Sequence, residues 1–186
     1  MVVIGAPAVG SSLYILAQHI ERKGISKEVQ VIDKARVPIV KLMDTKTGTL
    51  VDISFNKGNG PENSRLVRSF MKEHRALKYL VLVLKCFLQQ RQLNEPYSGG
   101  VGSYALILMI VSFLQANAGE TNLGALLTEF MHLYGVTFNY FTVGICVREG
   151  GHYFSKVERE WYDLARPYQI CIEDPNDLGT LIELAS

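Results

Sequence analysis

The spacing of hydrophobic and polar residues predicts a strand-rich first part of the chain. The two kinds of residue alternate over residues 29–32, and an apolar, β-prone run stands at residues 50–55, so both segments are expected to form strands. A third strand is expected over residues 37–42, where Pro38 places it at an edge of the sheet or at the start of its pairing. The turn at residues 45–48 predicts a hairpin between the strands on either side of it.

The first residues predict the end of another strand and one helix. The apolar run at residues 2–4 stops at a Gly-Ala-Pro break, and Ser11 or Ser12 can cap a helix over residues 13–23. Residues 1–56 are therefore expected to form a strand-rich module with a single helix.

Beyond this module the apolar positions recur three and four residues apart, which predicts helices. The expected helices begin near residue 63 and span residues 77–93, 103–117 and 123–134. Because the helix at 77–93 is apolar on all sides, we expect it to be mostly buried. Short strands are expected at 139–141 and 144–147, before an extended run and a loop at 170–179. A strand module followed by a helical one predicts an α+β fold with a ligand cleft between its halves.

The composition describes an ordered globular protein. Hydrophobic residues make up 48% of the 186 positions and charged residues 20%, which excludes a disordered chain. The net charge of +1 gives no overall signature for nucleic acid, so such a role must rest on a local site. The longest charge-free apolar stretch, residues 105–114, is too short to cross a membrane. Three widely spaced cysteines and no secretion signal favour a soluble intracellular protein.

Asp52 is a carboxylate inside the apolar, β-prone run at residues 51–56. A strand interior is an unfavourable place for an aspartate, so its presence needs a reason. One interpretation is an edge-strand aspartate that accepts hydrogen bonds from a neighbouring turn. The other is a metal ligand for phosphoryl transfer, a reaction that uses two or three carboxylates around two cations. The residue by itself leaves both interpretations open.

Lys85 is a cation within the apolar helix expected at residues 77–93. An unpaired ammonium group in buried surroundings is costly. The side chain must therefore extend to water, pair with a carboxylate or face a polar cleft. In a cleft, Lys85 would serve as a phosphate ligand.

Two loops carry candidate contacts to a nucleotide. A glycine-rich loop at residues 99–102 opens a helix whose first backbone amides suit anions and whose Ser103 adds a hydroxyl. Tyr104 can stack on a base or pack in the core. Near the end of the chain, Asp174 and Asn176 stand in an acidic loop, which is either a solvated turn or a set of polar groups that read base edges.

Four segments of the chain match one family in the same order. They are Val-Pro-Ile-Val-Lys at 37–41, Val-Asp-Ile-Ser-Phe-Asn at 51–56, Leu-Asn-Glu at 93–95 with Gly-Gly-x-x-Ser-Tyr at 99–104, and Cys-Ile-Glu-Asp-Pro at 171–175. Together they resemble the terminal nucleotidyltransferases of the DNA polymerase β-like superfamily. The branch they resemble most is the nuclear poly(A) polymerases of RNA surveillance, the catalytic subunits of TRAMP-type complexes.

This resemblance implies a role for each candidate residue. Asp52 corresponds to the third catalytic aspartate of the family's palm, and so to a metal ligand. Nucleotide contacts are implied for Asn63 and Ser64 near the ribose and phosphates, Lys85 at the triphosphate, Ser103 at a phosphate, Tyr104 stacked on the base, and Asp174 and Asn176 near the base. The implied substrate is ATP, and the implied cofactor is Mg²⁺ or Mn²⁺.

The resemblance also divides the chain into three parts. Residues 1–56 correspond to an incomplete nucleotidyltransferase palm, residues 57–169 to a helical central domain of the poly(A) polymerase-associated type, and residues 170–186 to the nucleotide-recognition loop and a truncated return to the palm. The family's Gly-Ser and Asp-x-Asp motifs are expected just before residue 2, and this chain does not contain them. The recognition loop after Pro175 is shorter than is usual for the branch.

The function implied by the resemblance is the addition of AMP from ATP to RNA 3′ ends in nuclear RNA surveillance. Its implied partners are the RNA 3′ end, a zinc-knuckle RNA-binding protein and an RNA helicase, with no DNA and no membrane. Because two of the three expected aspartates are missing, this chain alone is expected to be inactive. The alternative is a non-catalytic scaffold of the same family that binds RNA or protein partners.

Overall fold

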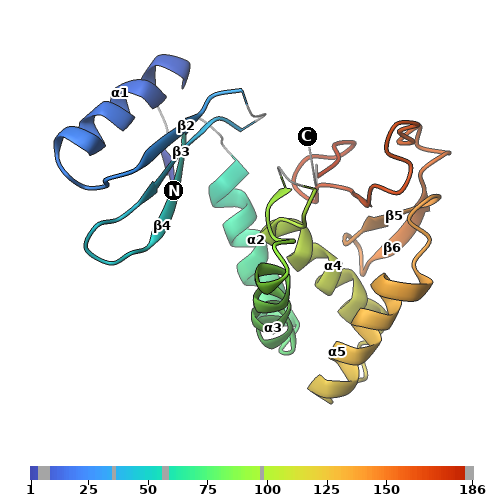
Figure 1. Ribbon diagram of the computed structural model, residues 1–186. Coiled ribbons are helices and arrows are strands. Elements are labelled where there is room, and N and C mark those ends of the chain that lie inside the picture. The colour runs from blue at the N-terminus through green and yellow to red at the C-terminus, as the bar shows by residue number, and fades with distance from the viewer. Residues whose placement is uncertain (4–8, 35–36, 56–58, 97–98, 183–186) are drawn as a thin grey trace. The chain divides into compact units, whose positions relative to one another are not determined.

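The structure is a computed structural model of the 186-residue chain (Figure 1). It describes residues 1–3, 9–34, 37–55, 59–96 and 99–182. The chain folds into two compact units, Met1–Ser64 and Arg65–Ser186, which we call unit 1 and unit 2. The predicted α+β class is confirmed. The three-part division of the sequence stays a prediction.

Unit 1 contains a four-stranded sheet with the order β1-β4-β3-β2. Its strands are β1 (Val2–Val3), β2 (Val29–Ile32), β3 (Ile39–Met43) and β4 (Leu50–Phe55). β1 runs parallel to β4, whereas the other neighbours are antiparallel. Within the described residues the predicted strands and the β3–β4 hairpin are therefore confirmed, whereas residue 4 of the first predicted strand and the break predicted at residues 5–7 lie outside those residues. Because β3 is an inner strand, Pro38 stands at the start of its pairing and not at an edge.

Helix α1 (Val9–Arg22) covers one face of this sheet (Figure 1). Leu13, Ala17 and Ile20 are buried on one side of the helix and pack with Val40 and Ile53 of the sheet. The predicted start of the helix is wrong, because the helix begins before the two candidate capping serines. The first turn of α1 consists mainly of small residues, and the regular spacing of apolar residues begins only at Leu13. The spacing therefore could not predict where the helix begins.

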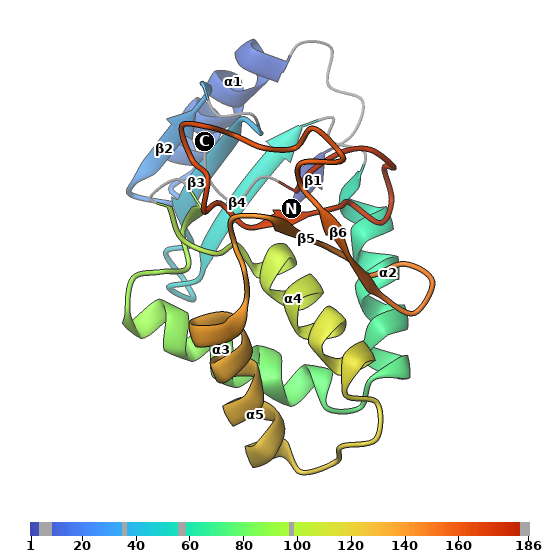
Figure 2. The same ribbon diagram turned by 90° about the vertical axis from the view of Figure 1, so that its right-hand side faces the viewer.

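Unit 2 is built around helix α4, which lies in the middle of the other helices (Figure 2). The helices are α2 (Asn59–Glu73), which begins in unit 1, α3 (Leu77–Gln90), α4 (Ser103–Ala116) and α5 (Leu123–His132), followed by the π-helical turn Leu133–Thr137. A second sheet has the order β6-β5-β7, with β5 (Val143–Cys146), β6 (His152–Ser155) and β7 (Cys171–Ile172). The predicted helices are confirmed, although α2 begins four residues earlier than expected.

One predicted strand of unit 2 is wrong, and another strand was missed. Asn139 is followed by a turn, in which its side-chain oxygen accepts hydrogen bonds from the backbone N–H groups of Phe141 (3.0 Å) and Thr142 (3.2 Å). An asparagine that bonds the backbone in this way competes with strand pairing. The strand begins instead at Val143, and its partner β6 lacks the alternation that would have predicted it.

The prediction that α3 is mostly buried is also wrong. Leu77, Leu80, Val81 and Leu84 are buried, but Tyr79, Leu82 and Val83 are 47%, 65% and 50% exposed. An apolar helix sequence does not tell how many of its faces are covered, and among the described residues one face of α3 is covered. No helix in the described ranges is long and apolar enough to span a bilayer.

Candidate nucleotide-binding site

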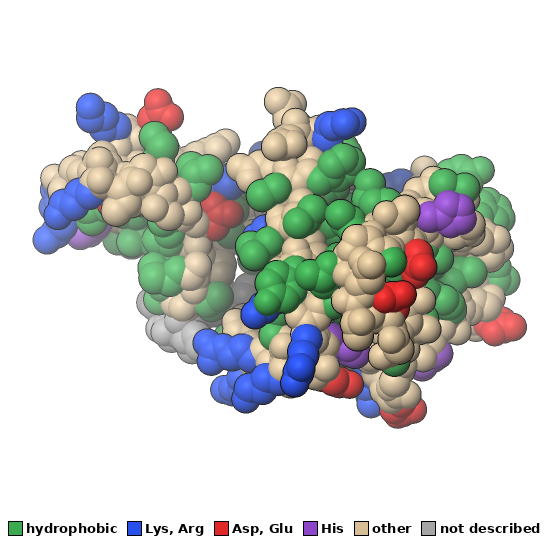
Figure 3. All heavy atoms as spheres, turned by 90° about the horizontal axis from the view of Figure 1, so that it is seen from below, with side chains coloured by type: hydrophobic (Ala, Val, Ile, Leu, Met, Phe, Trp, Pro, Cys, Tyr) green, Lys and Arg blue, Asp and Glu red, His purple; other side chains and the backbone are tan. Residues whose placement is uncertain are grey.

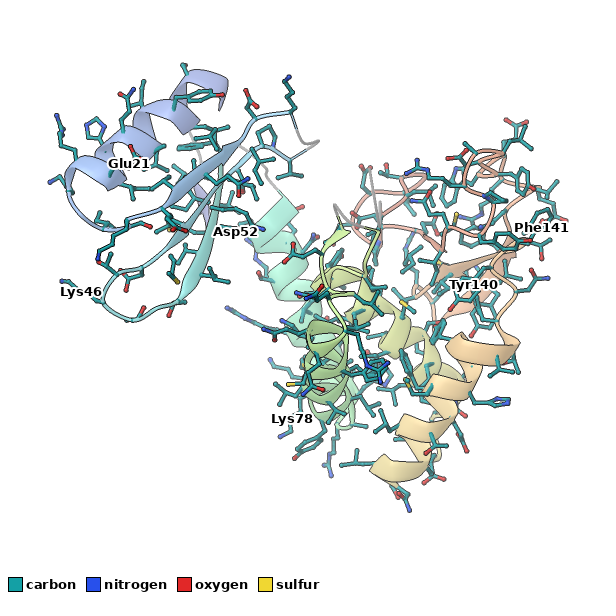
Figure 4. All side chains as sticks on the ribbon, in the orientation of Figure 1. Glu21, Lys46, Asp52, Lys78, Tyr140 and Phe141 are labelled. Carbon is teal, nitrogen blue, oxygen red and sulfur yellow. The ribbon has the colours of Figure 1, made fainter. Side chains whose placement is uncertain are left out.

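Asp52 lies on the face of the unit 1 sheet that α1 does not cover (Figure 4). Side chains alternate along β4, so Val51, Ile53 and Phe55 face α1 and Asp52 faces the other way. β4 is an inner strand and Asp52 is exposed. Its side chain makes no hydrogen bond or ion pair that the structure records in its described residues. The edge-strand interpretation is therefore wrong. The residue opposite Asp52 on the neighbouring strand β3 is Lys41.

Asn63 and Ser64 lie in the second turn of α2, close after β4 in the sequence. The start of this helix lies close to β1, since a Cβ atom at Gly60 would come within 2.9 Å of Cγ2 of Val2. Glycine therefore allows the helix to approach the strand. Asn63 is half-buried, whereas Ser64 is exposed.

The glycine-rich loop before α4 is held by close backbone contacts. A Cβ atom at Gly100 would lie 2.5 Å from the carbonyl oxygen of Leu93, so only glycine fits there. The Gly100 N–H donates a hydrogen bond to the carbonyl of Glu95 (2.9 Å). Gly102 is the extended N-cap residue of α4 and provides no side-chain cap. The first N–H groups of α4, with the exposed Ser103 hydroxyl beside them, are suited to an anion.

Tyr104, Asp174 and Asn176 are brought together in unit 2, although the tyrosine is far from the other two in sequence. Burial raises the pKa of the Tyr104 hydroxyl, the nearby Asp174 carboxylate raises it further, and the nearby Asn176 side chain lowers it. Tyr104 is half-buried and Asn176 is exposed. An aromatic ring beside an amide is an arrangement that can stack on a base and bond its edge.

The recognition loop is closed by its own hydrogen bonds. The N–H of Asp174 donates to the carbonyl of Thr180 (2.8 Å), and the carboxylate of Asp174 accepts from the N–H of Asn176 (3.0 Å). The Thr180 hydroxyl donates to the carboxylate of Asp177 (2.9 Å). Asp174 is buried, and its backbone N–H and its carboxylate both form hydrogen bonds within the loop. Asp174 therefore helps to fix the conformation of the loop.

A partly buried ion pair supports the loop, and the sequence did not predict it. Arg159 donates to the carboxylate of Glu173 (2.7 Å) while its guanidinium lies over the ring of Phe154, 4.1 Å from the centroid. Burial raises the pKa of Glu173, but hydrogen bonds from Cys146 and Arg159 lower it more, so the net shift is downward. Since the pair joins residues of two separate loops, no sequence spacing could have revealed it.

Lys85 lies on the exposed part of α3. Its ammonium group forms no ion pair with any carboxylate that the structure describes. Of the three options that the sequence left open for this side chain, exposure to water is the one observed. A role at a triphosphate stays a prediction.

The donors in unit 1 fit a hard divalent cation in kind but not in number. Carboxylate oxygens such as those of Asp52 are ligands that Mg²⁺ accepts. The described residues contain no group of three or more His, Cys, Asp or Glu side chains that could hold a metal ion. Asp52 would thus supply one ligand of a site.

Two protein-family models match the chain. A model of the Cid1 family poly A polymerase matches residues 122–179. A model described as poly(A) RNA polymerase, mitochondrial-like, central palm domain matches residues 9–72. Asp52, Asn63 and Ser64 lie inside the second match, and Asp174 and Asn176 lie inside the first.

Known proteins show the same relation along nearly the whole chain. Poly(A) RNA polymerase cid14 of Schizosaccharomyces pombe is 44% identical over 182 residues, which cover 94% of this chain and 27% of that protein. The inactive non-canonical poly(A) RNA polymerase protein Trf4-2 of Drosophila melanogaster is 36% identical, over 90% of this chain and 45% of that protein. A solved structure of the polymerase core of TRAMP, an RNA surveillance complex, matches with a TM-score of 0.83 and 34% identity, over 96% of this chain and 58% of that one.

The chain therefore belongs to the terminal nucleotidyltransferases of the polymerase β-like superfamily, and its relatives within that class are poly(A) polymerases of the Cid1 and TRAMP type. The resemblance inferred from the four motifs is confirmed. This chain spans 27% of the length of the first of these curated relatives and 45% of the second.

Proposed function

We propose that this chain binds the nucleotide in a poly(A) polymerase-like enzyme that adds AMP from ATP to RNA 3′ ends. The observation that carries the proposal is the group formed by Tyr104, Asp174 and Asn176 beside the uncapped start of α4. An aromatic ring and polar groups suit a base, while the N–H groups at a helix start without a side-chain cap suit phosphates. Membership of the terminal nucleotidyltransferases supports the same assignment.

The reaction is attack of an RNA 3′-hydroxyl on the α-phosphate of ATP, which breaks the bond to pyrophosphate. In the proposed assignment Tyr104 stacks on adenine and Asn176 bonds the edge of the base. Ser103 and Lys85 hold the phosphates, and Asn63 and Ser64 lie at the ribose and the phosphates. These contacts orient the α-phosphate for attack.

Asp52 is the residue of this chain that would hold a divalent cation, with Mg²⁺ or Mn²⁺ as the proposed ion. The chemistry that such ions would supply is activation of the attacking hydroxyl and neutralisation of charge on the leaving group. The proposed setting is nuclear RNA surveillance. A zinc-knuckle RNA-binding protein and an RNA helicase are the proposed partners.

Calorimetric titration of the chain with ATP, with and without Mg²⁺, tests the proposal. We expect ATP to bind, and to bind more tightly with Mg²⁺ than without it. In the presence of Mg²⁺, Asp52→Asn should weaken ATP binding about ten-fold, which corresponds to about 1.4 kcal/mol. Asp33→Asn, an exposed aspartate in the same unit, is the matched control and should leave the affinity unchanged. Absence of ATP binding to the folded chain would contradict the proposal.

A non-catalytic scaffold is a second candidate, since one relative is named as an inactive polymerase. A scaffold has no need of nucleotide contacts. Absence of ATP binding to the folded chain, or an ATP affinity that is equal with and without Mg²⁺ and unchanged in Asp52→Asn, would favour the scaffold.

A further inference from the structure

Helix α2 carries three basic side chains that the nucleotide site does not use. Arg65, Arg68 and Lys72 are exposed and follow one another three and four residues apart, so they lie on one face of the helix. The buried Phe70 and the partly buried Leu66 lie on the opposite face, against the core of unit 2. We call Arg65, Arg68 and Lys72 the basic row.

The basic row has no acidic counterpart. No carboxylate among the described residues lies within ion-pair distance of these three side chains. The two glutamates of the helix, Glu62 and Glu73, stand in its first turn and at its last residue. Like charges three and four residues apart repel one another and destabilise a helix. A polyanion bound along the row would relieve this repulsion.

The charge of the row contrasts with that of the chain as a whole. Residues 65–91 contain seven of the 19 lysines and arginines but one of the 18 aspartates and glutamates, although the net charge of the chain is +1. Figure 3 shows Lys and Arg side chains gathered beside a row of hydrophobic ones on the surface seen from below. The excess charge is therefore local to α2, α3 and the turn between them.

We propose that the basic row binds the phosphate backbone of single-stranded RNA. The inference rests on the proposed function, which requires an RNA chain behind the reacting 3′ end. Three cations in line on a rigid helix, separated by about 4.5 and 6 Å of helix rise, suit the regular phosphates of a strand. Arginine also bonds phosphate through two parallel N–H groups. Because phosphates carry no sequence, the row binds RNA without sequence preference.

Fluorescence anisotropy with a labelled single-stranded RNA of about 15 nucleotides tests this inference. The unmodified chain is compared with the triple variant Arg65→Gln, Arg68→Gln, Lys72→Gln at about 50 and about 200 mM salt. We expect the variant to bind about 10-fold more weakly at the lower salt, and the slope of log affinity against log salt to become shallower by about 2. The three residues are exposed, so folding is checked simply by the fluorescence of the single tryptophan, Trp161.

A matched control removes three charges elsewhere. The triple variant Lys23→Gln, Lys34→Gln, Lys46→Gln changes exposed lysines of unit 1 and should keep the affinity within about two-fold. Equal losses in both variants, or no RNA binding by the folded chain at the lower salt, would overturn the inference. So would equally tight binding of poly-L-glutamate of the same charge, which would indicate an acidic protein partner. The titration contains no ATP, so failure of the nucleotide site leaves its outcome unaffected.

Discussion

Helices α3 and α4 have the same length of 14 residues and similarly apolar sequences, yet they differ in burial. Nine residues of α4 are buried and only four of α3. The charged residues of the two helices indicate this difference in burial. Helix α3 contains Lys78 and Lys85, which are seven residues apart and therefore lie on one side of the helix. Helix α4 contains no charged residue. A pair of lysines thus identifies the side of an apolar helix that stays in water.

The largest expected effect is in the core around α4. Phe113 is 2% exposed and packs edge-on against Phe130, with ring centroids 5.7 Å apart. Phe113→Ala should lower the free energy of unfolding of unit 2 by about 3–5 kcal/mol, because a cavity remains. Urea unfolding followed by the fluorescence of Trp161, which lies in unit 2, measures the loss. Leu82→Ala, on the exposed side of α3, should change it by less than about 0.5 kcal/mol. Similar losses of unfolding free energy in the two variants would contradict the difference in burial between α3 and α4.

The partly buried ion pair between Arg159 and Glu173 is expected to have the next largest effect. Glu173→Gln should lower the stability of unit 2 by about 1.5–3 kcal/mol at neutral pH, since a charged hydrogen bond to Arg159 is lost. The pKa of Glu173 is lower in the folded state than its ordinary value of 4.5. Its contribution is therefore complete above the unfolded-state pKa and disappears as the pH falls through the folded-state pKa. Stability curves of the two proteins should converge in acid, and a constant gap down to low pH would rule out this ion pair as the cause.

Each of the two helices has a tyrosine near its start, and the two tyrosines are expected to differ in their effect on ATP binding. Tyr104 is the second residue of α4 and belongs to the candidate site, whereas Tyr79 is the third residue of α3 and is exposed. Removal of a base-stacking ring costs about 1–3 kcal/mol, so Tyr104→Ala should weaken ATP binding about 5- to 150-fold. Tyr79→Ala should have no effect in the same calorimetric titration. If Tyr104→Ala and Tyr79→Ala changed the ATP affinity equally, the nucleotide would not bind against Tyr104.

The smallest expected effect is at the lysines of α3. Lys85→Met should weaken ATP binding by about 0.5–1 kcal/mol, which is about two- to five-fold, because the ammonium group is exposed and its interaction is screened. Lys78→Met, two helical turns earlier (labelled in Figure 4), is the control. Added salt should reduce the Lys85 effect. A loss that is as large in Lys78→Met would show a general charge effect and no specific contact.

Much of the fold followed from the period of the apolar positions. The strands of unit 1 and the helices of both units have apolar periods regular enough to be recognised, whereas β6 of unit 2 does not alternate and was missed. The burial of α3 could not be predicted, since it depends on which neighbours are present and not on the helix itself. The turn at Asn139 was missed for a related reason: the residues that follow it have strand propensity, but a side-chain hydrogen bond to the backbone overrides it.

The candidate site was predictable only in part. The residue types at Ser103, Tyr104, Asp174 and Asn176 pointed to nucleotide chemistry, and the structure adds that the last three meet. The Arg159–Glu173 pair that supports them joins two loops by a tertiary contact, so it has no local pattern. For Asp52 the sequence left two interpretations. The position of β4 inside the sheet removes the edge-strand one.

The central claim is that ATP binds at the start of α4, with its base against Tyr104. Backbone amide NMR shifts of the chain during an ATP titration test this claim most directly. We predict the largest changes at Ser103, Tyr104 and Asn176, with little change along the exposed side of α3. Saturable binding with its largest shifts away from these three residues would contradict the account.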